Sequence, residues 1–213
     1  MNNKIRIGII GGAGYTGGEL IRLLLVHPHA TIAFVHSKSN AGNPLHHVHQ
    51  DLLGSTDLLF SGEINNNIDL LFLCLGHGES TKFLKENEIE ASIKIIDLAN
   101  DFRLNKDAIQ GNRTFVYGLP EINQAMIATA KNIANPGCFA TAIQLGLLPL
   151  ANAGLLKDVY ATGITGSTGA GQSLSATSHF SWRANNIQAY KTLTHQHVAE
   201  ILQSLHGLQN NDQ

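Results

Sequence analysis

The chain has few of the features that mark several large classes of protein. Its 213 residues include 2 cysteines and 5 prolines, and only 14% are charged. Two cysteines cannot form a disulfide framework, so we expect a reduced, cytoplasmic protein. The 14 Lys and Arg are outnumbered by 16 Asp and Glu, which leaves no basic field to bind nucleic acid or an anionic membrane. A hydrophobic content of 43% excludes intrinsic disorder.

Long apolar runs are also missing. Runs such as residues 70–75 are far shorter than the roughly 20 residues of a membrane span. The first six residues lead directly into a strand-like segment, without the apolar region and cleavage site of a signal peptide. We therefore expect a soluble protein that has no membrane partner.

The N-terminal part alternates short apolar runs with segments of helical periodicity. The runs predict strands at 5–10, 31–35, 68–75 and 93–98, and the periodic segments predict helices at 18–26 and 80–88. The polar residues 36–57 indicate a loop with a short helix. Alternation of this kind is typical of a parallel sheet covered on both faces. We predict an α/β fold, with a doubly wound, Rossmann-type parallel sheet that forms a dinucleotide-binding domain over residues 1–135.

The pattern changes after Asn135-Pro-Gly137. We expect a long apolar helix at 138–150, a strand at 159–165, a Gly/Ser/Thr loop up to Ser178, and an amphipathic helix at 197–205. One clear strand is too few to close a sheet. Residues 136–213 are therefore predicted to be the N-terminal portion of an incomplete α/β catalytic or substrate domain.

Glycines are abundant, 21 in all, and cluster where the first strand meets the first helix. Gly12-Ala-Gly14-Tyr-Thr-Gly17 matches G-x-G-x-x-G, a turn that lets backbone approach a pyrophosphate at a helix N-terminus. The alternative is a glycine-rich turn that binds nothing. The residues predicted to bind a dinucleotide here are Gly11, Gly14, Tyr15, Thr16 and Gly17.

The end of the second strand predicts which dinucleotide is bound. NAD sites usually place an acidic residue there to hold the ribose 2′-hydroxyl, whereas a cation suits the 2′-phosphate of NADP. This strand ends in Val-His-Ser37-Lys38-Ser39, without an acid. The sequence therefore favours NADP(H) over NAD, bound through Ser37 and Lys38. The alternative is that this segment is an ordinary polar loop.

The two cysteines lie in different contexts. Cys74 interrupts a buried apolar strand, where a thiol behaves as a small hydrophobe. Cys138 follows Asn-Pro-Gly and opens the long apolar helix, whose N-terminus favours a thiolate. Cys138 is either a nucleophile or a structural thiol.

Two groups of histidines could carry chemistry. His46, His47 and His49 could suggest a metal, but without Cys or carboxylates at ligand spacing we favour a solvated loop and predict no metal site. His195 and His197 precede the last helix, and either could be a general acid or base.

Several longer strings resemble one family, the N-acetyl-γ-glutamyl-phosphate reductases of arginine biosynthesis, which are relatives of aspartate-semialdehyde dehydrogenase. The strings are Gly-Gly-Ala-Gly-Tyr-Thr-Gly-Gly-Glu-Leu at 11–20, Ile-Asp-Leu-Ala-Asn-Asp-Phe-Arg-Leu at 96–104, Tyr-Gly-Leu-Pro-Glu at 117–121, Asn-Pro-Gly-Cys-Phe-Ala-Thr-Ala at 135–142, Thr-Gly-Ser-Thr-Gly-Ala-Gly at 165–171 and His-Gln-His-Val-Ala-Glu-Ile at 195–201. They occur in family order. Family members continue beyond the last string, which implies that this chain lacks the C-terminal part.

The resemblance implies roles for particular residues. Cys138 matches the nucleophile and His195 best matches the acid/base. Gly76 and His77 resemble a loop on the cofactor side of the family's site, although Gly76 stands where the family would have a proline. Ser167 and Gly169 lie in a loop where the family binds substrate and cofactor through backbone.

The implied function is NADPH-dependent reduction of an N-acyl-γ-glutamyl phosphate to the semialdehyde through a cysteine thioester. The acyl group, acetyl or succinyl, is left open, and a homo-oligomer is expected at full length. One alternative is a reductase like aspartate-semialdehyde dehydrogenase. The other is a non-catalytic NADP-binding module.

Overall fold

A computed structural model describes residues 4–209 of the chain. The residues form two compact units, each described here by itself. The first unit runs to Gly118 and includes Asn123–Asn135. The second comprises Leu119–Ile122 and everything described from Pro136 onward.

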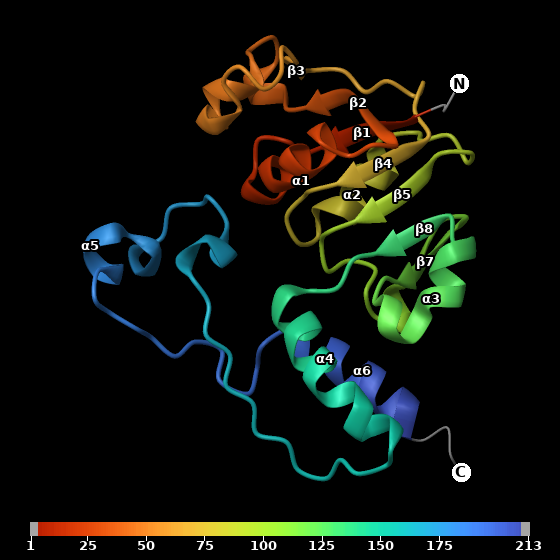
Figure 1. Cartoon of the computed structure of the whole chain (residues 1–213), viewed down its shortest axis with the longest axis vertical. Coiled ribbons are helices and arrows are strands. Elements are labelled where there is room, and N and C mark those ends of the chain that lie inside the picture. Colours follow the sequence, from red (N-terminus) through yellow and green to blue (C-terminus); the bar gives the residue numbers. More distant parts are fainter. Residues whose placement is uncertain (1–3, 210–213) are drawn as a thin grey trace. The chain divides into compact units, whose positions relative to one another are not determined.

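The first unit is built on one sheet of eight strands (Figure 1). Its strands are β1 (Ile5–Ile10), β2 (Ala30–His36), β3 (Phe60–Ser61), β4 (Leu70–Leu73), β5 (Lys94–Asp97), β6 (Ile109–Gln110), β7 (Arg113–Tyr117) and β8 (Asn132–Ala134). They lie in the order β3-β2-β1-β4-β5-β8-β7-β6. Every pairing is parallel except that of β6 with β7. The predicted α/β fold with a doubly wound parallel sheet is confirmed.

The strand order fixes where a ligand can bind. From β1 the chain adds β2 and β3 on one side, and then β4 and β5 on the other. The order therefore reverses between β1 and β4. In open α/β sheets, ligands bind at such a reversal, beyond the carboxyl ends of the strands.

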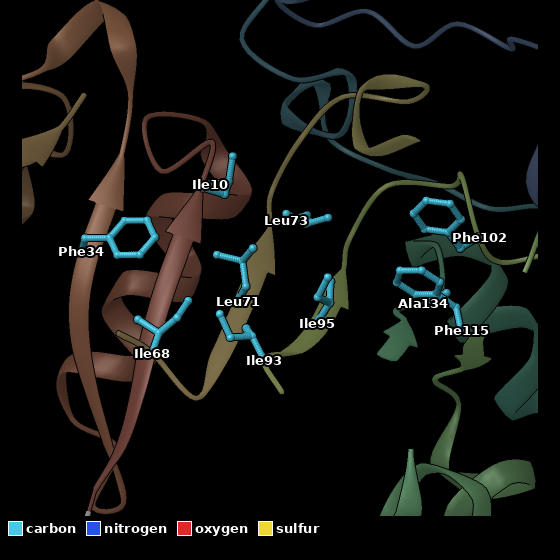
Figure 2. Close-up of a cluster of buried hydrophobic side chains, with 10 residues drawn as sticks. All are labelled: Ile10, Phe34, Ile68, Leu71, Leu73, Ile93, Ile95, Phe102, Phe115 and Ala134. Atoms are coloured by element: carbon cyan, nitrogen blue, oxygen red, sulfur yellow. The ribbon is translucent and has the colours of Figure 1, made fainter. Parts of the chain in front are cut away.

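Each face of the sheet has its own apolar core. On β4, Leu71 and Leu73 belong to one buried cluster, while the alternate residues Leu70 and Phe72 pack against another. Side chains alternate between the faces of a strand, so the two clusters lie on opposite faces. Figure 2 shows the first cluster, which includes the stacked rings of Phe102 and Phe115. This arrangement explains the near-continuous apolar strands in the sequence.

A different helix packs into each of the two cores. Helix α1 (Tyr15–Leu25) buries Ile21 and Leu24 in one cluster, whereas α2 (Glu79–Glu86) packs Phe83 and Leu84 against the other. The helices expected at 18–26 and 80–88 are thus present, α1 starting three residues earlier. Residues 36–57, expected to be a loop with a short helix, contain the short 3₁₀ helices η1 (Lys38–Asn40), η2 (Leu45–His47) and η3 (Gln50–Leu52). Two further elements, η4 (Asn105–Asp107) and α3 (Pro120–Thr129), follow β5 and β7.

The second unit is dominated by a pair of helices. Helices α4 (Cys138–Asn152) and α6 (His197–Gln209) pack together, and both were expected from the sequence (Figure 1). Buried residues on the two helices are Ala140, Gln144, Leu148 and Ala151 on α4, and His197, Glu200, Ser204 and Leu205 on α6. Along the chain, the segment between α4 and α6 contains η5 (Ser167–Ala170), η6 (Ala176–Ser178) and the short α5 (Phe180–Arg183).

The prediction of a strand at 159–165 is wrong. This segment has no regular secondary structure, and Tyr160 and Ile164 are 95% and 79% exposed. β-branched and aromatic residues favour a strand only where a neighbouring strand can pair with it. Among residues 4–209, every strand belongs to the sheet of the first unit.

Candidate functional site

The turn between β1 and α1 requires glycine for steric reasons. Gly11 has φ +77°, and a Cβ there would lie 2.3 Å from the Cys74 carbonyl oxygen. A Cβ on Gly17 would lie 2.7 Å from the Gly11 carbonyl oxygen. These two glycines therefore allow the turn to close against α1 and against the end of β4.

The N-terminus of α1 is left open by the third glycine. Gly14 is the N-cap, and a Cβ on it would meet only the Gly11 oxygen, at an ordinary 3.5 Å. Tyr15 and Thr16 are exposed in the first turn, which contains no acidic residue. An anion can therefore approach this helix end, as a dinucleotide pyrophosphate does.

The loop after β2 is polar and partly ordered by its own side chains. Ser37 is buried, Lys38 is exposed, and the Asn40 amide donates hydrogen bonds to the hydroxyls of Ser37 (3.0 Å) and Ser39 (3.1 Å). The pKa of His36 is lowered, mainly by burial and then by the charge of Lys38, whereas Glu63 opposes the shift. The sequence reasoning missed Glu63 because it follows the distant strand β3.

The loop after β4 carries Gly76, His77 and Gly78. Asn100 donates its backbone N–H to His77 Nδ1 at 3.2 Å. The Asp101 carboxylate accepts the backbone N–H groups of Gly78 (2.8 Å) and Thr81 (2.9 Å), and so caps α2. The predicted cofactor residues of the first unit thus follow β1, β2 and β4 on either side of the strand-order reversal.

A buried carboxyl lies beneath this edge of the sheet. Asp97, at the end of β5, is fully buried, and its Oδ1 accepts hydrogen bonds from Ser80 Oγ (2.5 Å) and the Ala99 N–H (3.2 Å). Among residues 4–209, nothing forms a hydrogen bond to Asp97 Oδ2. Burial raises its pKa to about 6. Asp97 lies within the string at 96–104, but the sequence assigned it no role.

The two thiols differ as the sequence predicted. Burial, with the nearby charge of Asp97, raises the pKa of Cys74 to about 12, so this thiol stays protonated and unreactive at neutral pH. Cys138 is exposed and is the first residue of α4, directly after the N-cap Gly137. Cys138 therefore lies at the positive end of the α4 helix dipole.

His195 packs beside the first turn of α4. Its ring meets that of Phe139, the residue after Cys138, edge-on at 5.6 Å between centroids, and it also contacts Tyr190 at 5.6 Å. Burial, followed by the charge of Lys191, lowers the pKa of His195. The imidazole is therefore neutral at pH 7 and can accept a proton.

His197 occupies a different environment. It is 6% exposed, with its Nε2 3.9 Å from Glu200 Oε1, and its ring lies 4.6 Å from that of His195. The other Glu200 oxygen accepts the N–H of Gly137 at 3.0 Å. Of the two histidines, His195 is the more accessible.

Ser167 and Gly169 lie in η5, in the second unit. Ser167 is half-buried, whereas Gly169 is exposed. Nothing in the geometry of this unit tests their predicted role in binding, which stays a prediction.

The solvated-loop interpretation of His46, His47 and His49 is wrong for one of them. His47 is exposed and His46 is half-buried, but His49 is buried, with Nε2 2.7 Å from the Gly12 carbonyl oxygen. The sequence could not show this, because Gly12 lies 37 residues away. Among residues 4–209, no three His, Cys, Asp or Glu side chains are grouped to hold a metal ion. Within the same residues, no helix is both long and apolar enough to cross a membrane.

Comparison with known proteins defines the class. The family described as semialdehyde dehydrogenase, NAD binding domain, matches residues 6–130, and the semialdehyde dehydrogenase dimerisation domain matches residues 138–213. The chain therefore belongs to the semialdehyde dehydrogenase family.

Individual relatives are more specific. The chain is 60% identical over 207 residues to the N-acetyl-γ-glutamyl-phosphate reductase of Flavobacterium johnsoniae, and 55% identical over 207 residues to that of Christiangramia forsetii. Each alignment covers 97% of this chain. It covers 64% and 63% of the two relatives, so the chain spans less than two thirds of their length. The resemblance found in the sequence is confirmed.

A solved structure supports the fold. Aspartate semialdehyde dehydrogenase with NADP from Candida albicans matches with a TM-score of 0.51 and 18% identity, over 72% of this chain and 48% of that one. At this identity, the match supports the α/β fold alone.

Proposed function

We propose that this chain carries the NADPH-binding and thiol chemistry of an N-acyl-γ-glutamyl-phosphate reductase, which forms the γ-semialdehyde and releases phosphate. The observation that carries the proposal is the exposed Cys138 at the start of α4, with the neutral His195 packed against Phe139. The relatives named as this reductase support the substrate class.

The chain's own residues supply the acyl transfer. The Cys138 sulfur attacks the acyl carbon of the acyl phosphate, the C–O bond to phosphate breaks, and a thioester remains on Cys138. His195 accepts the thiol proton, because its lowered pKa keeps it neutral. The proton is later returned to the sulfur as the aldehyde leaves.

The first unit holds the dinucleotide in this proposal. Gly11, Gly14 and Gly17 form a turn whose open helix end fits a pyrophosphate. Ser37 and Lys38 would bind the 2′-phosphate, and Gly76 and His77 would line the site from the loop after β4. When bound, NADPH supplies the hydride that reduces the thioester.

The remaining assignments are proposals of the same kind. Residues 1–135 would bind the dinucleotide and residues 136–213 would bind the substrate. Ser167 and Gly169 would bind the cofactor, in a loop whose backbone also contacts the substrate. The match to a dimerisation domain supports a homo-oligomer at full length. NADPH and acyl phosphates are metabolites of the cytoplasm, where we place the reaction.

Intact-mass analysis tests the proposal. The chain is exposed to N-acetyl-γ-glutamyl phosphate without NADPH, and we expect one N-acetylglutamyl adduct, lost in Cys138→Ser and kept in the matched control Cys74→Ser. An adduct with β-aspartyl phosphate of equal yield would favour the aspartate-semialdehyde-dehydrogenase alternative. NADPH binding without any adduct would favour the non-catalytic module and contradict the proposed chemistry.

A further inference from the structure

His49 joins the segment after β2 to the glycine turn after β1. Its Nε2 lies 2.7 Å from the carbonyl oxygen of Gly12, the residue at the centre of the turn. A carbonyl oxygen can only accept a hydrogen bond, so Nε2 carries the proton and donates it. This contact determines the tautomer of a neutral His49.

The hydrogen bond also orients a peptide of the turn. The peptide between Gly12 and Ala13 is planar and trans, so its N–H points opposite to its C=O. While His49 holds the Gly12 carbonyl, the Ala13 N–H must therefore point away from the imidazole. His49 thereby determines in which direction one amide of the turn is presented.

The imidazole itself is held from several sides. Leu45 and Leu52, on either side of His49, are buried in the cluster that contains Ile21 and Leu24 of α1. The His49 ring leaves no space for a side chain at Gly18, where a Cβ would lie 2.6 Å from its Cε1. The ring is therefore a fixed donor against α1 rather than a mobile surface group.

An ion pair fixes the same segment to α1. The Arg22 guanidinium donates to both carboxylate oxygens of Asp51, at 2.5 and 2.7 Å. Arg22 belongs to α1, and Asp51 is two residues from His49. The residues around His49 thus pack on the helix whose N-terminus follows the turn.

We propose that His49 is a positioning residue for dinucleotide binding: its Nε2–H fixes the Gly12–Ala13 peptide and, with it, the shape of the turn that receives the pyrophosphate at the N-terminus of α1. The inference rests on the proposed function, because it requires that the turn binds NADPH. It assigns His49 no contact with the 2′-phosphate, so the preference for NADPH over NADH does not depend on it.

Two substitutions separate the donor from the ring. The amide nitrogen of Gln can occupy the position of His Nε2, whereas that of Asn occupies the position of Nδ1 and cannot reach Gly12. In fluorescence titrations of the full chain with NADPH, we expect His49→Asn to weaken binding about fivefold to tenfold, and His49→Gln to stay within about twofold of the unsubstituted chain. The exposed His47→Asn is the matched control and should change nothing. The NADPH/NADH affinity ratio should be the same in all four proteins.

Each outcome decides between the proposals. Binding by His49→Asn as tight as that of the unsubstituted chain would overturn the role of His49 alone. Equal losses in His49→Asn and His49→Gln, at unchanged melting temperatures, would also overturn it, because a restored donor must rescue binding. If His49→Asn does not fold, His49→Gln decides: a tenfold loss in a folded protein contradicts the inference. An unsubstituted chain that binds no NADPH would refute the proposed function, and this inference with it.

Discussion

Glu200 and Gly137 are 63 residues apart in the sequence, yet the Glu200 carboxylate accepts the Gly137 N–H at 3.0 Å. Gly137 is the N-cap of α4, so its amide lies one residue before Cys138. Glu200 is 2% exposed and also faces His197. One carboxylate on α6 therefore holds the N-cap of α4 through a hydrogen bond.

Removal of this carboxylate should destabilise the second unit. Glu200→Ala leaves the buried Gly137 N–H without that acceptor, and we expect a loss of about 2–3 kcal/mol in the free energy of unfolding. Glu200→Gln keeps an oxygen acceptor and should lose about 1 kcal/mol. Urea titration measures the loss, and faster hydrogen exchange at Gly137 would localise it. The exposed Glu121→Ala is the control, and an equal loss there would contradict this role of Glu200.

Asp97 should make stability depend on pH in an unusual direction. Its pKa in the folded chain is about 6, above the 3.8 of an unperturbed Asp, so folding favours the protonated carboxyl. This contribution is complete below pH 3.8 and is lost as the pH rises through 6.

The substitution Asp97→Asn should therefore stabilise the chain at neutral pH. The variant's gain in free energy of unfolding over the unsubstituted chain should be about 3 kcal/mol larger at pH 7.5 than at pH 3.5, because the amide carries no buried charge. Denaturant titrations across this pH range measure the difference. Asp107→Asn, at an exposed site, should show no such trend. A pH-independent difference for Asp97→Asn would mean that folding does not raise the pKa of Asp97.

The two cysteines should differ in their reaction with iodoacetamide. At pH 7.5 we expect labelling at the exposed Cys138 and labelling at least ~100-fold slower at Cys74, whose pKa is about 12. Peptide mass analysis assigns the label, and unfolding in urea should equalise the two rates. Comparable rates in the folded chain would show that the Cys74 thiol is accessible.

Lys38 should account for the dinucleotide preference. If its ammonium binds the 2′-phosphate, Lys38→Ala will weaken NADPH binding about 10- to 100-fold and leave NADH binding unchanged, as expected for a hydrogen bond to a charged group. Titration with both dinucleotides measures the two affinities. Lys82→Ala removes an exposed lysine from α2 and serves as the control. Equal losses for NADPH and NADH would assign Lys38 a role other than selectivity.

The sequence predicts the elements whose burial produces a regular pattern. The strands β1, β2, β4 and β5 are near-continuous apolar runs packed on both faces of the sheet, and the helices α1, α2, α4 and α6 have apolar residues at helical spacing. All eight elements were expected. β8 was not, because its three residues are too few for a period to be visible. The segment at 159–165 shows the converse, since it has strand-forming residues but no strand to pair with.

The candidate site divides in a similar way. Cys138 and the glycine turn could be found because a helix start and a tight turn leave local marks in the sequence. His49 could not, because its partner is the backbone of Gly12, and a carbonyl group has no sequence pattern of its own. Glu200 lies within the string at 195–201, but nothing in that string shows its contact with Gly137, which results from the packing of α4 on α6.

The Asp101 cap on α2 has a consequence for where a diphosphate can bind at this edge of the sheet. Two helices, α1 and α2, begin beside the reversal in strand order, and both N-termini attract negative charge. At α2, the Asp101 carboxylate already takes up the amides of Gly78 and Thr81 and would repel a phosphate. At α1, the N-cap is a glycine that has no side chain to compete. The N-terminus of α1, and not that of α2, is therefore the helix end at this edge of the sheet that can accept a diphosphate.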